Sequence, residues 1–96
     1  MTRKEAEELV RRLAAQEIEL VRSKHFWDEA TDERFRIQDV LWILKSRTGV
    51  TAPQYDEAHG NYKVEVVGED MEGRRAKVVL GLRSDGLCIG ITIHGL

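Results

Sequence analysis

The stretch NYKVEVVGEDMEGRRAKVVLGLRSDGLCIGITIHG, residues 61–95, decides the fold because apolar and polar residues alternate in it three times. Alternation with a period of two residues is typical of a strand that has one side against a core and the other in water. Between the second and third runs, the pair Asp85-Gly86 is a strong hairpin signal, because both residues tolerate positive φ. We therefore predict a three-stranded antiparallel meander.

The same alternation assigns the side chains of the meander to two faces. On the third strand, the core side is expected to carry the apolar residues Leu87, Ile89, Ile91 and Ile93. The other side of this strand then carries Cys88, Gly90, Thr92 and His94. With helices packed on the apolar face, the opposite face of the sheet collects the polar residues Lys63, Glu65, Arg75, Lys77, Arg83, Thr92 and His94.

The residues before the meander are mainly helical by their periodicity. Thr2 and Glu5 have the spacing of a capping box, which predicts an N-terminal helix within residues 1–16. Residues 17–46 are predicted to hold a short strand or extended link and two helices. Residues 47–60 contain the only proline and little periodicity, so we predict a loop there. The predicted fold is one α+β domain, with N-terminal helices packed on one face of a three- to four-stranded antiparallel sheet.

Composition and charge narrow the class of protein. A chain of 96 residues fits one domain, and its net charge of −2 argues against a strongly basic nucleic-acid coat while leaving room for a small RNA site. No apolar run approaches the roughly 20 residues of a membrane span. The N-terminus MTRKEAEELVRRL is too charged for a signal peptide. We therefore expect a cytoplasmic protein that makes no membrane contact.

Cysteine and histidine usage gives no sign of a metal or of another cofactor. The single cysteine, Cys88, permits neither an internal disulfide nor a cysteine-rich zinc site, and we interpret it as a half-buried strand residue. No two of His25, His59 and His94 have the i, i+4 spacing of a helical metal site. The sequence therefore predicts no metal ligands and no cofactor.

His94, on the last predicted strand, is the main candidate for catalysis. Histidine suits general acid–base chemistry because its ordinary pKa lies near neutral pH. RNA cleavage through the 2′-hydroxyl needs such groups, together with cations that stabilise the charged phosphorane, and it needs no metal. Arg75 and Lys77 would hold the phosphate, with Lys63 or His25 in support. A solvated sheet face carries the same residue types, so a plain solvent face is the alternative.

Two stretches of the chain resemble a known family. SKHFWDEATDERFRIQDVLWIL, residues 23–44, is similar to the opening signature of domain-of-unknown-function family 4258, a small bacterial family. The matching positions are Ser23, His25, Phe35, Asp39, Val40 and Leu44. Residues 62–95 resemble the rest of the family at Tyr62, Gly68, Asp70, Gly73, Arg74, Val78 and Val79. The resemblance covers residues 18–95, and most of the matching positions are structural.

Members of this family are similar in layout to the RelE, BrnT and MqsR toxins. The resemblance therefore implies a toxin-like endoribonuclease that cleaves mRNA and is held inactive by a small antitoxin, often of a zinc-finger type. His94 then occupies the terminal-strand position at which such toxins use a histidine or a tyrosine. Taken with the charged sheet face, the catalytic candidates are His94, Lys77, Arg75 and His25. The RNA-binding candidates are Lys63, Arg74 and Arg83.

The sequence departs from the family pattern in its first signature. The arginines that family members carry on the helix fall on Glu29 and Glu33, so this helix is acidic. The final aromatic of the family is replaced by His94. These departures favour a second interpretation, a non-enzymatic module in which the acidic helix and the Thr48–Gly60 loop bind a protein partner.

Overall fold

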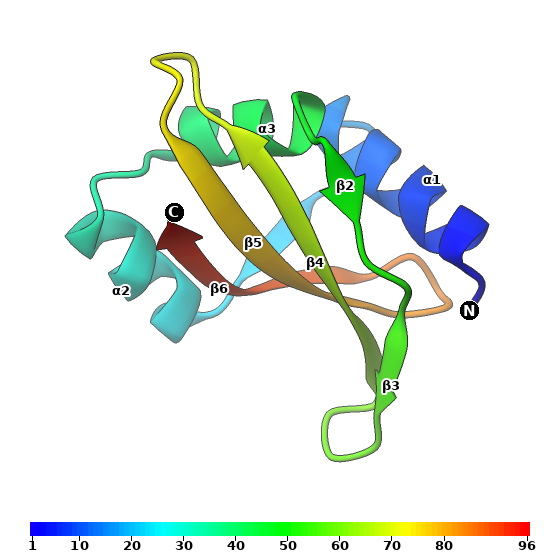
Figure 1. The fold of residues 1–96 in the computed structure, drawn as a ribbon. Helices are drawn as coiled ribbons and strands as arrows, with labels where there is room; N and C mark the ends of the chain where they lie inside the picture. Colours follow the sequence, from blue (N-terminus) through cyan, green and yellow to red (C-terminus); the bar gives the residue numbers. More distant parts are fainter.

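Three helices and a six-stranded mixed sheet make up the computed structural model, which describes residues 1–96 (Figure 1). The helices are α1 (Arg3–Ala14), α2 (Lys24–Asp32) and α3 (Ile37–Lys45). The strands are β1 (Leu20–Arg22), β2 (Gly49–Val50), β3 (Gln54–Asp56), β4 (Asn61–Glu69), β5 (Arg75–Leu82) and β6 (Cys88–Gly95). The predicted α+β class, with helices on a sheet, is confirmed.

The predicted meander forms the centre of the sheet. β4 pairs with β5 and β5 with β6, all antiparallel. In this register Val66 lies opposite Val78 and Val78 opposite Ile93, and all three side chains are fully buried. The turn between β5 and β6 includes Gly86, whose φ of +92° favours glycine. The alternating pattern therefore defined these strands and their turn correctly.

The edges of the sheet differ from the prediction. β1 pairs with β6 in parallel, with Leu20 opposite Cys88, so the sheet is mixed rather than wholly antiparallel. Residues 47–60, predicted as a loop, contain β2 and β3, which both pair with β4 and bring the sheet to six strands. β1, with three residues, is the short strand that the sequence allows within residues 17–46. The strands that were not predicted are β2 and β3, with two and three residues. They are too short to show an alternation, and their hydrogen bonds to longer strands define them.

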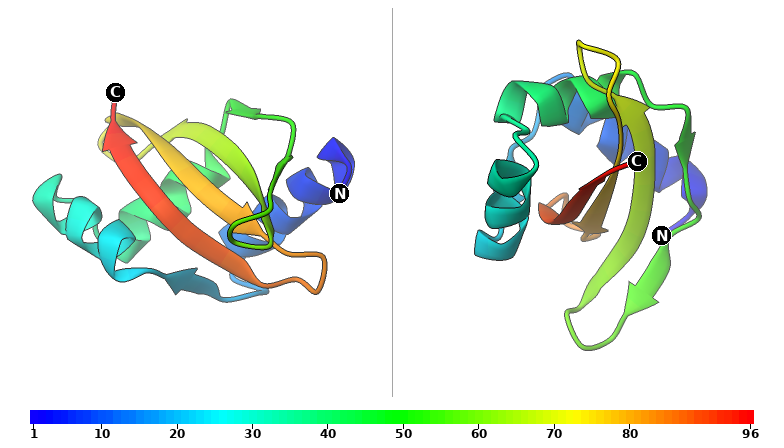
Figure 2. Two further views of the ribbon diagram at one scale, coloured as in Figure 1. Left: turned by 90° about the horizontal axis from the view of Figure 1, so that it is seen from below. Right: turned by 60° about the vertical axis from the view of Figure 1, so that its left-hand side comes forward.

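All three helices lie on one side of the twisted sheet, and the other side carries no helix (Figure 2). α3 packs on β4 and β5, α1 packs on α3, and α2 packs along β6. Val10 of α1, Phe26 of α2 and Ile43 of α3 are fully buried in this layer. The face of β4, β5 and β6 that points away from the helices is called the open face below.

The first helix begins where the sequence predicts. The Thr2 side chain accepts a hydrogen bond from the backbone N–H of Glu5 at 3.1 Å, and the Glu5 carboxylate accepts one from the backbone N–H of Thr2 at 2.9 Å. This reciprocal capping box satisfies two backbone donors that the first turn leaves unpaired. None of the three helices has the length and apolar character needed to cross a membrane.

β6 contains a bulge, which the sequence pattern does not reveal. Val79 lies opposite Thr92, but the next residue of β5, Leu80, lies opposite Gly90, so Ile91 is an extra residue on β6. An extra residue reverses the in–out alternation of the strand on one side of it. The predicted faces of β6 therefore hold only after the bulge.

The residues before the bulge lie on the faces opposite to those predicted. Cys88 and Gly90 are buried against the helices, whereas Ile89 and Ile91 are half-buried on the open face. Only Ile93 of the predicted apolar row is buried in the core. The predicted grouping of these isoleucines is wrong, because a strict two-residue period does not allow for an inserted residue.

Candidate functional site

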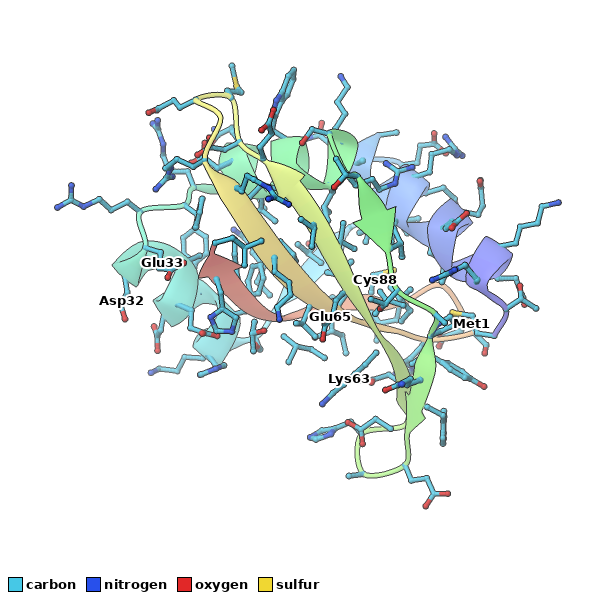
Figure 3. The ribbon with its side chains drawn as sticks, in the orientation of Figure 1. Met1, Asp32, Glu33, Lys63, Glu65 and Cys88 are labelled. Carbon is cyan, nitrogen blue, oxygen red and sulfur yellow. The ribbon has the colours of Figure 1, made fainter.

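Polar side chains collect on the open face, as the alternation predicts. Lys77 lies opposite His94 across β5 and β6, and cross-strand neighbours on one face have their Cβ atoms about 5 Å apart. Lys63 and Glu65 leave β4 on the same face, opposite Gly81 and Val79 of β5. Figure 3 shows these two side chains on β4 and Glu33 directly after α2, with β5 and β6 between β4 and this helix.

Hydrogen bonds at both ends of α2 hold this helix along the outer edge of β6. In this position, side chains of α2 reach the open face. The Ser23 hydroxyl caps α2 by accepting from the N–H of Phe26 at 3.1 Å, and it also lies 3.1 Å from the carbonyl of Gly90, to which it donates. At the other end of α2, the Glu33 carboxylate accepts a hydrogen bond from the backbone N–H of Gly95. The two contacts orient α2 beside the strand that carries the candidate histidine.

Glu29 of α2 lies between the two candidate histidines. Its Oε2 is 3.4 Å from Nδ1 of His94, and its Oε1 is 2.9 Å from Nε2 of His25. The Glu29 side chain is 21% exposed, whereas those of His94 and His25 are 49% and 70% exposed. Oε1 is buried and accepts no hydrogen bond, although Nε2 of His25 is its close neighbour. The carboxylate is thus mostly enclosed, and both rings remain accessible.

Sequence reasoning named His25 and His94 but assigned no role to Glu29. The four-residue spacing between His25 and Glu29 on one helix was a visible signal for their contact. The contact with His94 was not visible, because it depends on how α2 lies against β6. We call these three residues the Glu29 cluster.

The other two predicted catalytic residues, Lys77 and Arg75, lie on β5, next to the strand that carries His94. Lys77 is the cross-strand neighbour of His94, and its Nζ is 3.6 Å from a carboxylate oxygen of Glu65. Arg75 is exposed at the start of β5, two residues before Lys77 on the same face. Both cations therefore flank the Glu29 cluster on the open face.

Two of the predicted RNA-binding residues lie farther away. Lys63 is at the other end of the open face, with its Nζ 3.5 Å from Asp56. The ring of His59 contacts the same carboxylate at 2.9 Å, and this hydrogen bond, with Lys63 nearby, lowers the pKa of Asp56. Arg83 lies in the turn after β5 and pairs with Asp85 at 2.8 Å. The structure does not bring Arg83 to the Glu29 cluster.

Arg74, the third predicted RNA-binding residue, is engaged by the protein itself. Its Nε donates to the buried carboxylate of Asp70 at 2.7 Å, and its two terminal nitrogens donate to the carbonyls of Glu33 and Arg34 at 3.0 and 3.1 Å. Its guanidinium carbon lies 4.2 Å from the centre of the Phe35 ring. Arg74 therefore joins the β4–β5 turn to the connection between α2 and α3.

The donor set of the site has no metal-binding arrangement. No group of three or more His, Cys, Asp or Glu side chains, the Glu29 cluster included, is arranged so that it could hold a metal ion. In the Glu29 cluster the only carboxylate lies between two imidazoles, an arrangement suited to orienting rings and exchanging protons. The open face thus places two imidazoles and one carboxylate beside the cations Lys77 and Arg75.

Comparison of the chain with protein-family models, with curated proteins and with solved structures finds no match.

Proposed function

We propose that this chain is a metal-independent endoribonuclease of the toxin type, with the Glu29 cluster and Lys77 as its active site. The observation that carries the proposal is the position of Glu29 between His25 and His94, on a face of the sheet that no helix covers. Two imidazoles on either side of one carboxylate can divide the two proton transfers that RNA cleavage requires.

The reaction that suits these groups is transfer of the phosphoryl group within the RNA, from the 5′-oxygen of one nucleotide to the 2′-oxygen of its neighbour. One imidazole accepts the proton of a 2′-hydroxyl, whose oxygen then bonds to the adjacent phosphorus. The bond from phosphorus to the 5′-oxygen breaks, and the other imidazole donates a proton to that oxygen. The products are a 2′,3′-cyclic phosphate and a free 5′-hydroxyl, and no oxidant or metal takes part.

The position of Glu29 supports a division of roles within the cluster. A carboxylate beside Nδ1 of a histidine favours the tautomer with its proton on that nitrogen, which leaves Nε2 as the free base. Nδ1 is the atom of His94 that faces Glu29, so its Nε2 is available for substrate. Lys77 beside it, and Arg75 at the end of the same strand, supply positive charge for the phosphorane.

The proposal that the nuclease is a toxin rests in addition on the resemblance of the sequence to the toxin-like family. Its expected substrate is mRNA, and its expected partner is a small antitoxin that covers the open face. Part of the element order, namely β1, α2, α3 and the meander β4–β6, supports the RelE-like layout that the resemblance implies, and α1, β2 and β3 are additional elements. Both the resemblance and the partner stay predictions.

Cleavage of a labelled single-stranded RNA in the presence of EDTA tests the proposal. Wild-type protein is expected to produce fragments that end in a 2′,3′-cyclic phosphate. His94→Ala is expected to lower the rate by about 100-fold or more, the usual contribution of a general acid or base. Lys45→Ala, at the end of α3 on the helix side, is the matched surface control and should keep the wild-type rate. Equal rates for wild type and His94→Ala would sink the assignment.

A second candidate is the non-enzymatic protein-binding module. The observation in its favour is the acidic exposed side of α2, which carries Asp28 and Asp32 and has no basic residue in its last turn. Passage over immobilised RNA at low salt separates the two candidates. A phosphate-binding face retains the protein in a salt-dependent way, and a protein-binding module flows through.

A further inference from the structure

A hollow of about 330 Å³ lies on the open face, between the start of α2 and the turn that joins β3 to β4. Its apolar lining comes from Ile89 and Ile91, which the bulge in β6 turns away from the core. Its polar lining comes from Ser23, His25, His59, Asn61 and Lys63. This volume is at the small end of the range for sites that hold an organic ligand.

Asn61 is the unusual member of this lining. It is only 4% exposed, and its buried Oδ1 has no hydrogen-bond partner in the protein. The carboxamide lies directly over Gly81, where an added Cβ would be 2.7 Å from Nδ2 of Asn61. Folded proteins rarely leave a buried acceptor unpaired, and here the protein itself supplies no donor to Oδ1 of Asn61.

We propose that this hollow binds one unstacked nucleobase of a single-stranded RNA, an inference that rests on the proposed endoribonuclease function. A carboxamide presents one donor and one acceptor side by side, and base edges offer the complementary pair. The isoleucine side chains offer the base an apolar surface, and the rings of His25 and His59 offer flat surfaces for stacking. The ammonium of Lys63 carries the charge that the phosphate of the same nucleotide needs.

The hollow and the Glu29 cluster are connected through His25. This residue lines the hollow, and its Nε2 also lies 2.9 Å from Glu29. Along β5, Gly81 under the hollow and Lys77 beside His94 are four residues apart, about 13 Å of strand. One RNA strand on the open face can thus place a base in the hollow and a nearby phosphate at His94.

Titration of the ¹⁵N-labelled protein with 5′-AMP tests the inference, with ribose 5-phosphate as the probe that lacks a base. We expect 5′-AMP to shift the side-chain amide signal of Asn61. We also expect it to bind about fivefold or more tightly than ribose 5-phosphate, because base stacking adds affinity. Equal affinities for the two probes, or an Asn61 amide signal that does not move, would overturn the inference.

Variants separate the hollow from the catalytic cluster. Asn61→Ala and Ile91→Asp are both expected to remove the preference for 5′-AMP over ribose 5-phosphate. Ile91 is only half-buried, so Ile91→Asp should fold even if Asn61→Ala does not. His94→Ala should bind 5′-AMP as the wild type does. Retention of the 5′-AMP preference in a folded Ile91→Asp variant would contradict the assignment.

The two proposals can fail independently. A protein that binds 5′-AMP at Asn61 but leaves RNA intact would keep the hollow as a base site and refute the nuclease. A protein that cleaves RNA but binds the two probes equally would keep the nuclease and refute the base site. In a protein that does both, Asn61→Ala should raise KM for RNA and leave kcat within about twofold, because it removes binding away from the reacting phosphate.

Discussion

The carboxylate of Glu29 lies beside the ring of His94, with 3.4 Å between Oε2 and Nδ1, although the two residues belong to a helix and to the last strand. The contact exists because Ser23 and Glu33 hold the two ends of α2 against β6. A carboxylate in this position orients the imidazole and selects its tautomer.

Replacing this carboxylate is the most direct test of its role. Glu29→Gln is expected to lower kcat for RNA cleavage by up to about 100-fold, because the imidazoles lose their orientation, while KM changes little. In ¹⁵N spectra of the ring nitrogens, the His94 tautomer with the proton on Nδ1 should lose population. Asp28→Asn is the matched control, since Asp28 pairs only with the exposed Lys24 at 3.2 Å. Unchanged kcat and ring signals in Glu29→Gln would remove Glu29 from the site.

The salt dependence of RNA binding reports the number of phosphates that the open face holds. Three cations, Lys63, Arg75 and Lys77, predict a slope of roughly −2 in a plot of log affinity against log salt, at about −0.7 per phosphate of a single strand. Lys77→Ala should reduce the magnitude of this slope by about 0.7, and Lys45→Ala should not change it. Fluorescence anisotropy of a labelled oligonucleotide measures the slope. A slope near zero would favour the protein-binding module.

The pair Asp70–Arg74 predicts loss of stability in acid. Burial raises the pKa of Asp70, but hydrogen bonds from the side chain and backbone of Arg74 and from the backbone of Glu72 outweigh it, so the net pKa is lowered. The stabilisation is therefore complete above the ordinary value of 3.8 and is lost as the pH falls through the lower folded value. Asp70→Asn should cost about 2 kcal/mol near neutral pH, and progressively less as the pH falls below 3.8.

Urea unfolding of wild type and Asp70→Asn at several pH values measures this difference. The free energies of unfolding of the two proteins should converge as the pH falls below about 4. A difference that stays constant down to about pH 2 would show that the ionised carboxylate is not what stabilises the fold.

Three glycines form a graded test of packing between the helices and the sheet. A Cβ at Gly68 would lie 2.1 Å from the backbone oxygen of Ile43, and one at Gly90 would lie 3.0 Å from the Phe26 ring. A ring can shift more easily than a backbone, so Gly68→Ala should cost about 3 kcal/mol and Gly90→Ala about 1 kcal/mol. Gly49→Ala meets no atom within 4 Å and should be nearly neutral. Urea denaturation measures the free energy of unfolding of each variant. A larger loss for Gly90→Ala than for Gly68→Ala would contradict the packing described.

The thiol of Cys88 is expected to be unreactive in the folded protein. It is fully buried under the helices, and burial raises its pKa to about 11. The thiolate is the reactive form, so alkylation by iodoacetamide near pH 8 should be slow in buffer and fast in urea. Mass spectrometry follows the reaction without interference, because the chain has no other cysteine. Fast labelling in buffer would show that β6 opens locally.

The sequence by itself determined the elements whose signals are local. The alternation in residues 61–95 predicted the meander, and Thr2 with Glu5 predicted the start of α1. The same alternation predicted that Lys77 and His94 share the open face, which the register confirms. These signals depend on neighbours a few residues apart, and such neighbours are readable in one dimension.

Only the tertiary structure decided the features that depend on contacts between distant segments. The parallel pairing of β1 with β6 and the bulge at Ile91 are set by hydrogen bonds to another strand, and neither leaves a periodic signal. Glu29 joined the candidate site, and Arg74 became part of the scaffold, because the packing of α2 brought them to partners far along the chain. A charged side chain has the same sequence signal in water and in a site, so its surroundings decide its role.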